Sequence, residues 1–159
     1  MPSGVVVAIN VNSEGGVPKH PVKSAFLHNG GVHGDRQNDL KHHGGPDRAV
    51  SIYSLELIHA LQHEGHPIVP GSTGENLTIE GLEWDVMEEG VRFTIGEAVI
   101  ELTGPAPPCK TISHSFLDKE FVRISENRYP GWSRWYARVI TEGYVKTDDH
   151  AELESIHRG

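Results

Sequence analysis

The chain has 159 residues, and Asp and Glu outnumber Lys and Arg by 22 to 14, for a formal net charge of −8. This length suits one domain with a sizeable core, and the acidic balance opposes a broad nucleic-acid or anionic-membrane surface while allowing a local basic pocket. No apolar run approaches the roughly 18 residues of a membrane span, and residues 1–11 lack a basic leader region. We therefore expect a single cytoplasmic domain over residues 1–159, with small molecules or proteins as partners.

The first part of the chain alternates short strands with glycine-rich loops. The run GVVVAINV at residues 4–11 is rich in β-branched residues and predicts a buried strand. Residues 12–21 and 29–34 are punctuated by Gly and Pro and predict loops. A short strand is expected between them, at residues 24–27.

A crowded polar segment follows at residues 34–53, where glycines precede a strand predicted for residues 49–53. His42 or His43, Asp47 and Arg48 could project into one pocket, because neighbouring glycines let the backbone approach a ligand closely. The alternative is a solvent-exposed loop in which Asp47 and Arg48 pair, an interaction that contributes only about 0–1 kcal/mol.

Residues 54–64 predict a helix with Ser54 as its N-cap and Gly65 as its stop signal. His59 and His63 stand four residues apart on it, a spacing that suits a metal. No carboxylate or cysteine offers a third ligand at matching spacing, and the chain has 11 histidines. A solvent-facing pair is the favoured interpretation.

A strand is expected in residues 71–81, and Glu75 and Asn76 at its start could form a second wall of the pocket, or belong to an ordinary turn. Residues 90–103 predict a hairpin, VRFTI and AVIELT, joined by Gly96 and Glu97 in a type II′ turn. Its second strand is expected to end at Gly104.

The only cysteine of the chain follows this hairpin, after Pro105, Pro107 and Pro108. Prolines favour extended backbone without ladder hydrogen bonds, so Cys109 is predicted on a stiff loop beyond the strand. A neighbouring cation such as Lys110 favours the thiolate, the reactive form. The alternative is that Cys109 packs as a small apolar residue.

The C-terminal part is predicted to be more helical. Residues 111–127 have an ambiguous pattern, but in residues 128–143 Trp132, Trp135, Tyr136, Val139 and Ile140 recur at helical spacing. Arg128, Arg134 and Arg138 could reach an anion, although a solvated face is the more usual role of such arginines. Residues 148–159 predict a frayed or loosely docked acidic tail.

Several short strands separated by Gly and Pro, with one or two covering helices, indicate a mainly β domain of barrel type. Four segments, in order, resemble the MOSC family, the domain named for the C-terminal part of molybdenum cofactor sulfurases: HGGPDRAV at 43–50, GENL at 74–77, RFTIGEAVIELTGPAPPCK at 92–110 and RYPGWSRWYARVITEG at 128–143. The resemblance covers residues 23–143, leaves residues 144–159 as a tail, and is closest to the small bacterial branch.

The resemblance implies a closed, mainly antiparallel β-barrel with a few short helices, and a cysteine that carries sulfur as a persulfide or ligates molybdenum. The resemblance implies that Cys109 is the sulfur carrier or metal ligand. The other residues implied or suggested at the site are His43, Asp47, Arg48, Glu75, Asn76, Lys110 and Arg128. Ala106 stands where the family often has a basic residue, which removes one expected phosphate contact.

The sequence is compatible with three functions. The first is sulfur transfer from a donor such as a cysteine desulfurase, plausibly toward molybdenum cofactor (molybdopterin). The second is a cofactor-binding component that reduces N-hydroxylated compounds with electrons from a redox partner. The third is a non-catalytic binding module. No pyridoxal phosphate site is expected, because no lysine stands in a suitable context.

Overall fold

The structure is a computed structural model and describes residues 3–36 and 45–154. The strands are β1 (Ser3–Val11), β2 (His20–Val22), β3 (Ser24–His28), β4 (Gly31–Val32), β5 (Val50–Ser54), β6 (Leu77–Glu80), β7 (Arg92–Ile95), β8 (Ala98–Ala106), β9 (Arg134–Thr141), β10 (Gly143–Lys146) and β11 (His150–Leu153). The α-helix is α1 (Leu55–His63), and the 3₁₀ helices are η1 (Pro46–Arg48), η2 (Trp84–Val86), η3 (Lys110–Ser115), η4 (Leu117–Lys119) and η5 (Phe121–Ile124).

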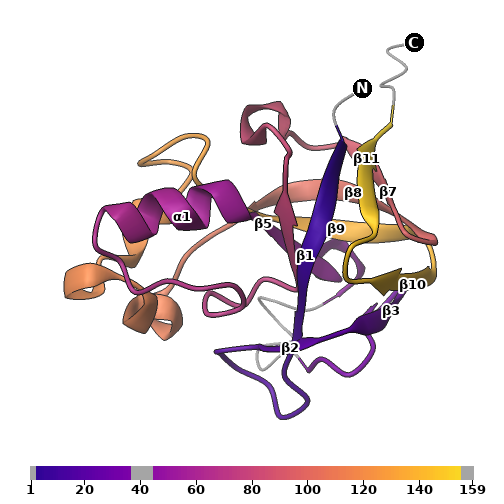
Figure 1. The fold of residues 1–159 in the computed structure, drawn as a ribbon, viewed down its shortest axis with the longest axis horizontal. Coiled ribbons are helices and arrows are strands. Elements are labelled where there is room, and N and C mark those ends of the chain that lie inside the picture. The colour runs from indigo at the N-terminus through magenta and orange to yellow at the C-terminus, as the bar shows by residue number, and fades with distance from the viewer. Residues whose placement is uncertain (1–2, 37–44, 155–159) are drawn as a thin grey trace.

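Within the described ranges the main sheet closes into a barrel. The strand order is β11-β7-β8-β9-β5-β6-β1, and β1 pairs back onto β11. The first and last strands of the chain therefore lie side by side (Figure 1). The mainly β barrel predicted from the sequence is confirmed, and β3, β4 and β10 form a second, three-stranded sheet.

The closing strand corrects the prediction of a loosely docked tail for residues 150–153, while residues 155–159 of the predicted tail lie outside the described residues. β11 pairs with β1 on one edge and β7 on the other, and Ala151 is completely buried. The acidic character of this segment misled the prediction, because alternate residues of a strand can face solvent while the others fill the core.

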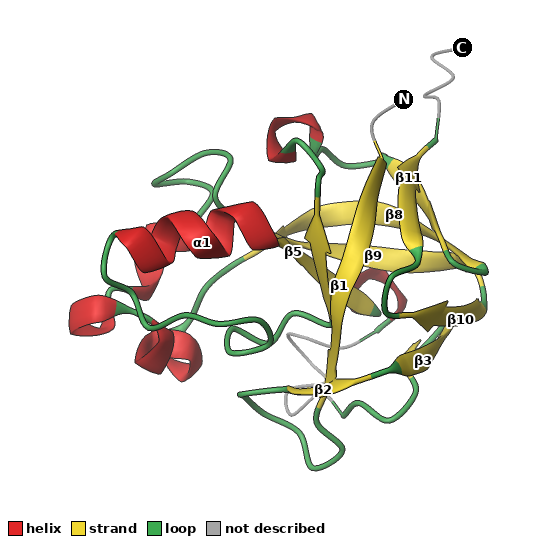
Figure 2. Cartoon of the chain, viewed as in Figure 1, coloured by secondary structure: helices red, strands yellow, loops and turns green. Residues whose placement is uncertain are grey.

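One pair of barrel strands departs from the expected antiparallel arrangement. β5 and β6 are parallel, with Ile52 opposite Leu77. Parallel strands need a crossover connection, and α1 supplies it. Figure 2 shows α1 and several short helices gathered on the same side of the barrel.

The predicted helix is confirmed, and its N-cap acts as expected. The Ser54 hydroxyl accepts a hydrogen bond from the Leu57 backbone N–H at 3.2 Å. Ile58 and Leu61 are buried against the barrel, whereas His59 and His63 point to solvent. This exposure agrees with the solvent-facing interpretation of the histidine pair.

The helix predicted for residues 128–143 is wrong, because residues 134–141 form the strand β9. Trp135, Ala137 and Val139 are buried, while the residues between them are more exposed, which is the period of a strand. Aromatic and β-branched residues satisfy both periods here. Hydrogen-bonded pairing with β8 on one edge and with β5 on the other stabilises the strand conformation.

β8 also continues two residues beyond the predicted stop at Gly104. Pro105 pairs with Trp135 and Ala106 with Arg134 of β9, after a register shift between Leu102 and Gly104. β7 does not run beside this part of β8, so a proline without an N–H is tolerated at this edge. β8 therefore runs to Ala106, and only Pro107 and Pro108 separate its end from Cys109.

Candidate functional site

A cavity of about 480 Å³ opens where β5, β8 and β9 meet the loops that precede β2 and β6. Its described lining residues come from six separate parts of the chain. They are Gly16, Val17, Lys19, Arg36, Arg48, Ser51, Thr73, Gly74, Asn76, Pro107, Cys109, Lys110, Thr111, Ile112, Arg134 and Tyr136.

Cys109 lies in the wall of this cavity. It follows Pro107 and Pro108, has extended backbone geometry and immediately precedes η3. Its side chain is partly exposed, and its Sγ lies 2.8 Å from the hydroxyl of Thr111. The loop position predicted for Cys109 is confirmed, and a thiol placed here is accessible to a ligand in the cavity.

Arg134 brings a buried positive charge to the same cavity. The residue is 7% exposed, and its Nη1 donates to the Thr73 carbonyl at 2.6 Å while Nη2 donates to the Pro107 carbonyl at 3.3 Å. Its Nε is buried with no hydrogen-bond partner. Within residues 3–36 and 45–154, no carboxylate forms an ion pair with it. Because a guanidinium does not lose its proton, the cavity wall carries a fixed positive charge.

Arg48 and Tyr136 form another part of the wall. The Arg48 guanidinium lies 5.3 Å from the centre of the Tyr136 ring, a distance that suits a cation–π contact. Burial raises the pKa of the Tyr136 phenol, and the charges of Arg134 and Arg48 only partly oppose this rise. Tyr136 is therefore a neutral hydrogen-bonding group at neutral pH.

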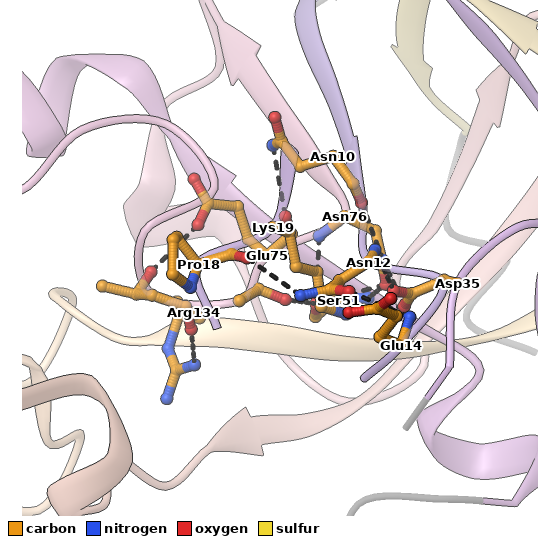
Figure 3. A network of polar contacts seen from close by, with 12 residues as sticks. Asn10, Asn12, Glu14, Pro18, Lys19, Asp35, Ser51, Glu75, Asn76 and Arg134 are labelled. Atoms are coloured by element: carbon orange, nitrogen blue, oxygen red, sulfur yellow. Dashed lines mark hydrogen bonds and ion pairs between the residues drawn. The ribbon is translucent and has the colours of Figure 1, made fainter. Parts of the chain in front are cut away.

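A polar network holds the opposite wall in place (Figure 3). Asp35 Oδ2 accepts from Lys19 Nζ at 2.6 Å and from Asn76 Nδ2 at 2.9 Å, and its Oδ1 accepts from the Asn12 backbone N–H. Asn76 in turn accepts from the Ser51 backbone N–H through its Oδ1. One carboxylate thus connects the loop after β1, the segment after β4 and the start of β6.

Glu75 lies beneath the cavity wall and does not line it. Its carboxyl group is completely buried and accepts hydrogen bonds from the Gly71 N–H and from the hydroxyls of Thr73 and Thr78. Burial is the largest influence and raises the pKa of Glu75, while these hydrogen bonds act in the opposite direction. Its role in this geometry is to fix the turn that carries Thr73.

The other predicted site residues are distributed as follows. Arg48, Asn76, Cys109 and Lys110 line the cavity together. Asp47 does not, because its side chain is 73% exposed and pairs with Arg138 at 3.2 Å. Arg128 is exposed and lies outside the lining. His42 and His43 lie outside the described residues.

The sequence left Arg134 open between reaching an anion and lying on a solvated face, and the structure places it in the cavity lining. The signal was present in the alternation of β9, since a period of two places Arg134 and Tyr136 on one face. The pairing of Lys19 with Asp35 had no comparable signal, because it joins two loops.

The described residues contain no cluster of three or more His, Cys, Asp or Glu side chains arranged to hold a metal ion. Within the same ranges, no helix has the length and apolar character needed to cross a membrane. Among the described lining residues, Cys109 is a soft donor and its neighbours in the lining include several cations.

Comparison with known proteins identifies the fold and its family. The model of the MOSC domain matches residues 39–152, well over half of the chain. The chain belongs to the MOSC family. This family is associated with molybdenum cofactor binding or sulfur transfer, and the match extends through the closing strand β11.

Two relatives of this MOSC protein are longer than it is. It is 37% identical over 149 residues to the uncharacterized protein YflK of Bacillus subtilis (strain 168), an alignment that covers 92% of this chain and 65% of YflK. It is 33% identical over 129 residues to protein YiiM of Escherichia coli (strain K12), covering 79% of this chain and 57% of YiiM. The matched region is therefore less than two thirds of each relative.

Solved structures show the same fold. The crystal structure of YiiM from Escherichia coli superposes with a TM-score of 0.71 at 27% identity, covering 98% of this chain and 71% of that one. The YuaD protein from Bacillus subtilis gives a TM-score of 0.74 at 19% identity and covers 97% of that chain. At this lower identity the YuaD likeness supports the fold alone.

Proposed function

We propose that this MOSC protein is a sulfur carrier in which Cys109 holds a transferable sulfur atom as a persulfide. The observation that carries the proposal is the shared cavity of Cys109, Lys110, Arg48 and Arg134. Positive groups near a thiol favour its thiolate, which is the nucleophile in sulfur exchange. They favour a persulfide anion for the same electrostatic reason.

The proposed cycle has two exchange steps. In the first, the Cys109 thiolate attacks the outer sulfur of a donor; the bond between that sulfur and the donor breaks, and the donor leaves with the electron pair. In the second, an acceptor that supplies an electron pair, such as a thiolate or a reduced metal centre, bonds to the outer sulfur; the bond between the two persulfide sulfurs breaks and Cys109 leaves as a thiolate. A cysteine desulfurase is one possible protein donor, and a metal–sulfur centre such as molybdenum cofactor is the acceptor that the family association favours.

A second candidate is a cofactor-binding component of a reductase, and the size and charge of the cavity favour it. About 480 Å³ is within the range of small-molecule sites, and the guanidinium of Arg134 in the cavity lining offers a positive charge to an anionic group. Arg48, Asn76 and Arg134 would hold the phosphate of a molybdopterin, and Cys109 would supply a soft ligand. When bound, the group would supply a two-electron centre for reducing N-hydroxylated compounds, with electrons from a redox partner.

One preparation distinguishes these functions. The protein is purified without reductant from a host that makes molybdenum cofactor, and its intact mass and molybdenum content are measured, with Cys109→Ser as the control. A gain of one sulfur atom that reductant removes and that Cys109→Ser lacks supports the carrier. Near-stoichiometric molybdenum without this adduct supports the reductase component.

The same preparation tests the non-catalytic alternative. Under that alternative Cys109 reacts with a thiol reagent only after unfolding, and neither sulfur nor molybdenum is found. Rapid titration of the thiol in the native protein would contradict it.

A further inference from the structure

The lining of the cavity differs in charge from the rest of the protein. The chain has a formal net charge of −8, yet five of the described lining side chains are Lys or Arg and none is Asp or Glu. These cations are Lys19, Arg36, Arg48, Lys110 and Arg134. A small anion is thus repelled by most of the surface and attracted to the place where the thiol lies.

Two of these cations differ in how their charge is balanced. Lys19 is paired with Asp35 at 2.6 Å, so its charge is compensated within the protein. Within residues 3–36 and 45–154, Arg134 is bonded to backbone carbonyls only, and its Nε has no hydrogen-bond partner. A buried cation without a counter-ion is unfavourable, and an anion in the cavity would relieve this. Arg134 therefore points to an anionic ligand, independently of Cys109.

We infer that the sulfur donor to Cys109 is a small sulfane-sulfur anion of the thiosulfate or thiosulfonate class, bound beside Cys109 by Arg134, Arg48 and Lys110. This inference rests on the proposed carrier function and names its substrate class. The two members of the class share an outer sulfur bonded to an oxidised sulfur that carries anionic or hydrogen-bond-accepting oxygens.

The chemistry needs no additional reactant. The Cys109 thiolate attacks the outer sulfur of thiosulfate, a new sulfur–sulfur bond forms, and the bond to the oxidised sulfur breaks. Its electron pair leaves with sulfite, so that a thiolate and a thiosulfate dianion become a persulfide anion and a sulfite dianion, with the total charge unchanged at −3. A thiosulfonate leaves a sulfinate in the same way.

The cations reduce the electrostatic repulsion that opposes this step. A thiolate and a dianion repel each other, and this repulsion is strongest when they come into contact. Arg134 contributes a guanidinium charge to the cavity lining, and Lys110 adjoins Cys109 in the chain. Preorganised positive groups of this kind stabilise the charge that develops on a leaving group. A neutral sulfane-sulfur donor gains much less from them.

The test compares anionic and neutral donors on the full chain. Reduced protein is mixed with thiosulfate, benzenethiosulfonate or the neutral donor dimethyl trisulfide at constant ionic strength. Modification of Cys109 is followed by intact mass. The anionic donors add one sulfur atom, whereas dimethyl trisulfide, attacked at its central sulfur with methanethiolate as the leaving group, leaves a methyl trisulfide on Cys109. Sulfite or sulfinate release is measured in parallel. The variants are Lys110→Ala and Arg48→Ala, with Lys146→Ala as a matched control, because Lys146 is exposed and lies outside the cavity lining.

We expect each cavity variant to load from thiosulfate at least about tenfold more slowly than the parent, and to load from dimethyl trisulfide within about twofold of it. Lys146→Ala should match the parent with all donors. Loading from benzenethiosulfonate but not from thiosulfate would assign the organic member of the class.

Other outcomes of this experiment would contradict either the donor class alone or the carrier function itself. If dimethyl trisulfide loads Cys109 but neither anion releases sulfite or sulfinate, the donor class is overturned and the carrier function survives. The same conclusion follows if Lys110→Ala, a change at an exposed side chain, slows the neutral and anionic donors equally. If no donor loads Cys109, the carrier function itself is overturned.

Discussion

Lys19 and Asp35 form a buried ion pair at the edge of the cavity, with Lys19 Nζ 2.6 Å from Asp35 Oδ2 and side chains that are 10% and 4% exposed. The same oxygen of Asp35 also accepts from Asn76 Nδ2 (Figure 3). The pair therefore does more than neutralise a charge, because it fixes the loop after β1 against the start of β6.

Replacing Asp35 alone should lower the free energy of unfolding more than replacing Asp35 and Lys19 together. Asp35→Asn leaves Lys19 buried without a counter-ion, and we expect it to lower the free energy of unfolding by about 3 kcal/mol. The double variant Lys19→Met with Asp35→Asn should lose less of the free energy of unfolding than Asp35→Asn alone. Urea unfolding of the parent, both single variants and the double variant gives the coupling; additive losses would show that the pair does not act as a unit.

A buried hydroxyl supports the segment that leads to Arg134. The Tyr53 hydroxyl is completely buried and donates to the Trp132 carbonyl at 2.7 Å. Tyr53→Phe leaves that acceptor unsatisfied, so we expect a loss of about 1–3 kcal/mol in the free energy of unfolding. Tyr144→Phe, at a residue that is 57% exposed, is the control and should change it by less than about 0.5 kcal/mol. Equal effects of the two variants would contradict this assignment.

The buried carboxyl of Glu75 should make the stability depend on pH. Burial raises its pKa in the folded protein, so its favourable contribution is complete below the unfolded value of about 4.3 and is lost as the pH rises through the raised folded value. Glu75→Gln cannot ionise and should become more stable relative to the parent as pH increases across this interval. Urea unfolding at a series of pH values measures the difference.

A variant of Glu75 that cannot accept hydrogen bonds is the control. Glu75→Ala leaves the Gly71 N–H and two threonine hydroxyls without their acceptor, so it should be less stable than Glu75→Gln by about 1–3 kcal/mol at any pH. A difference between Glu75→Gln and the parent that does not change with pH would disprove the raised pKa.

Gly71 is predicted to tolerate no side chain. Its φ is 82°, and a Cβ would lie 2.7 Å from the Lys19 carbonyl oxygen and 3.0 Å from Asn10 Cγ. Gly90 has a similar φ of 92° but nothing within 4 Å of the added atom. Both alanine variants incur the left-handed backbone penalty of about 1–2 kcal/mol, and Gly71→Ala should lose about 1–3 kcal/mol more through overpacking. The difference in thermal stability between the Gly71→Ala and Gly90→Ala variants measures the cost of the clash at Gly71.

Local signals in the sequence were sufficient for much of the fold. The β-branched run of β1, the cap at Ser54 and the glycine of the β7–β8 turn each act over a few residues, and Gly96 has the positive φ of 58° that such a turn requires. The prolines before Cys109 likewise placed the thiol on a loop without reference to any distant residue.

The site depended on contacts that no local pattern encodes. Arg134 reaches the cavity only because β9 is a strand, and its aromatic residues fit a helix equally well until β5 and β8 supply ladder hydrogen bonds on both edges. Asp47 and Arg48 are neighbours in the sequence, yet one faces solvent and the other lines the cavity.

The sequence by itself therefore determined the strand-rich class of this protein, its helix cap, its hairpin and the loop position of Cys109, because these follow from preferences of adjacent residues. Only the tertiary structure decided that β11 closes the barrel, that Asp35 anchors Lys19 and that Arg134 is buried beside the thiol. Each of these depends on a partner far away in the chain, and it is the burial of apolar strands against one another that brings such partners together.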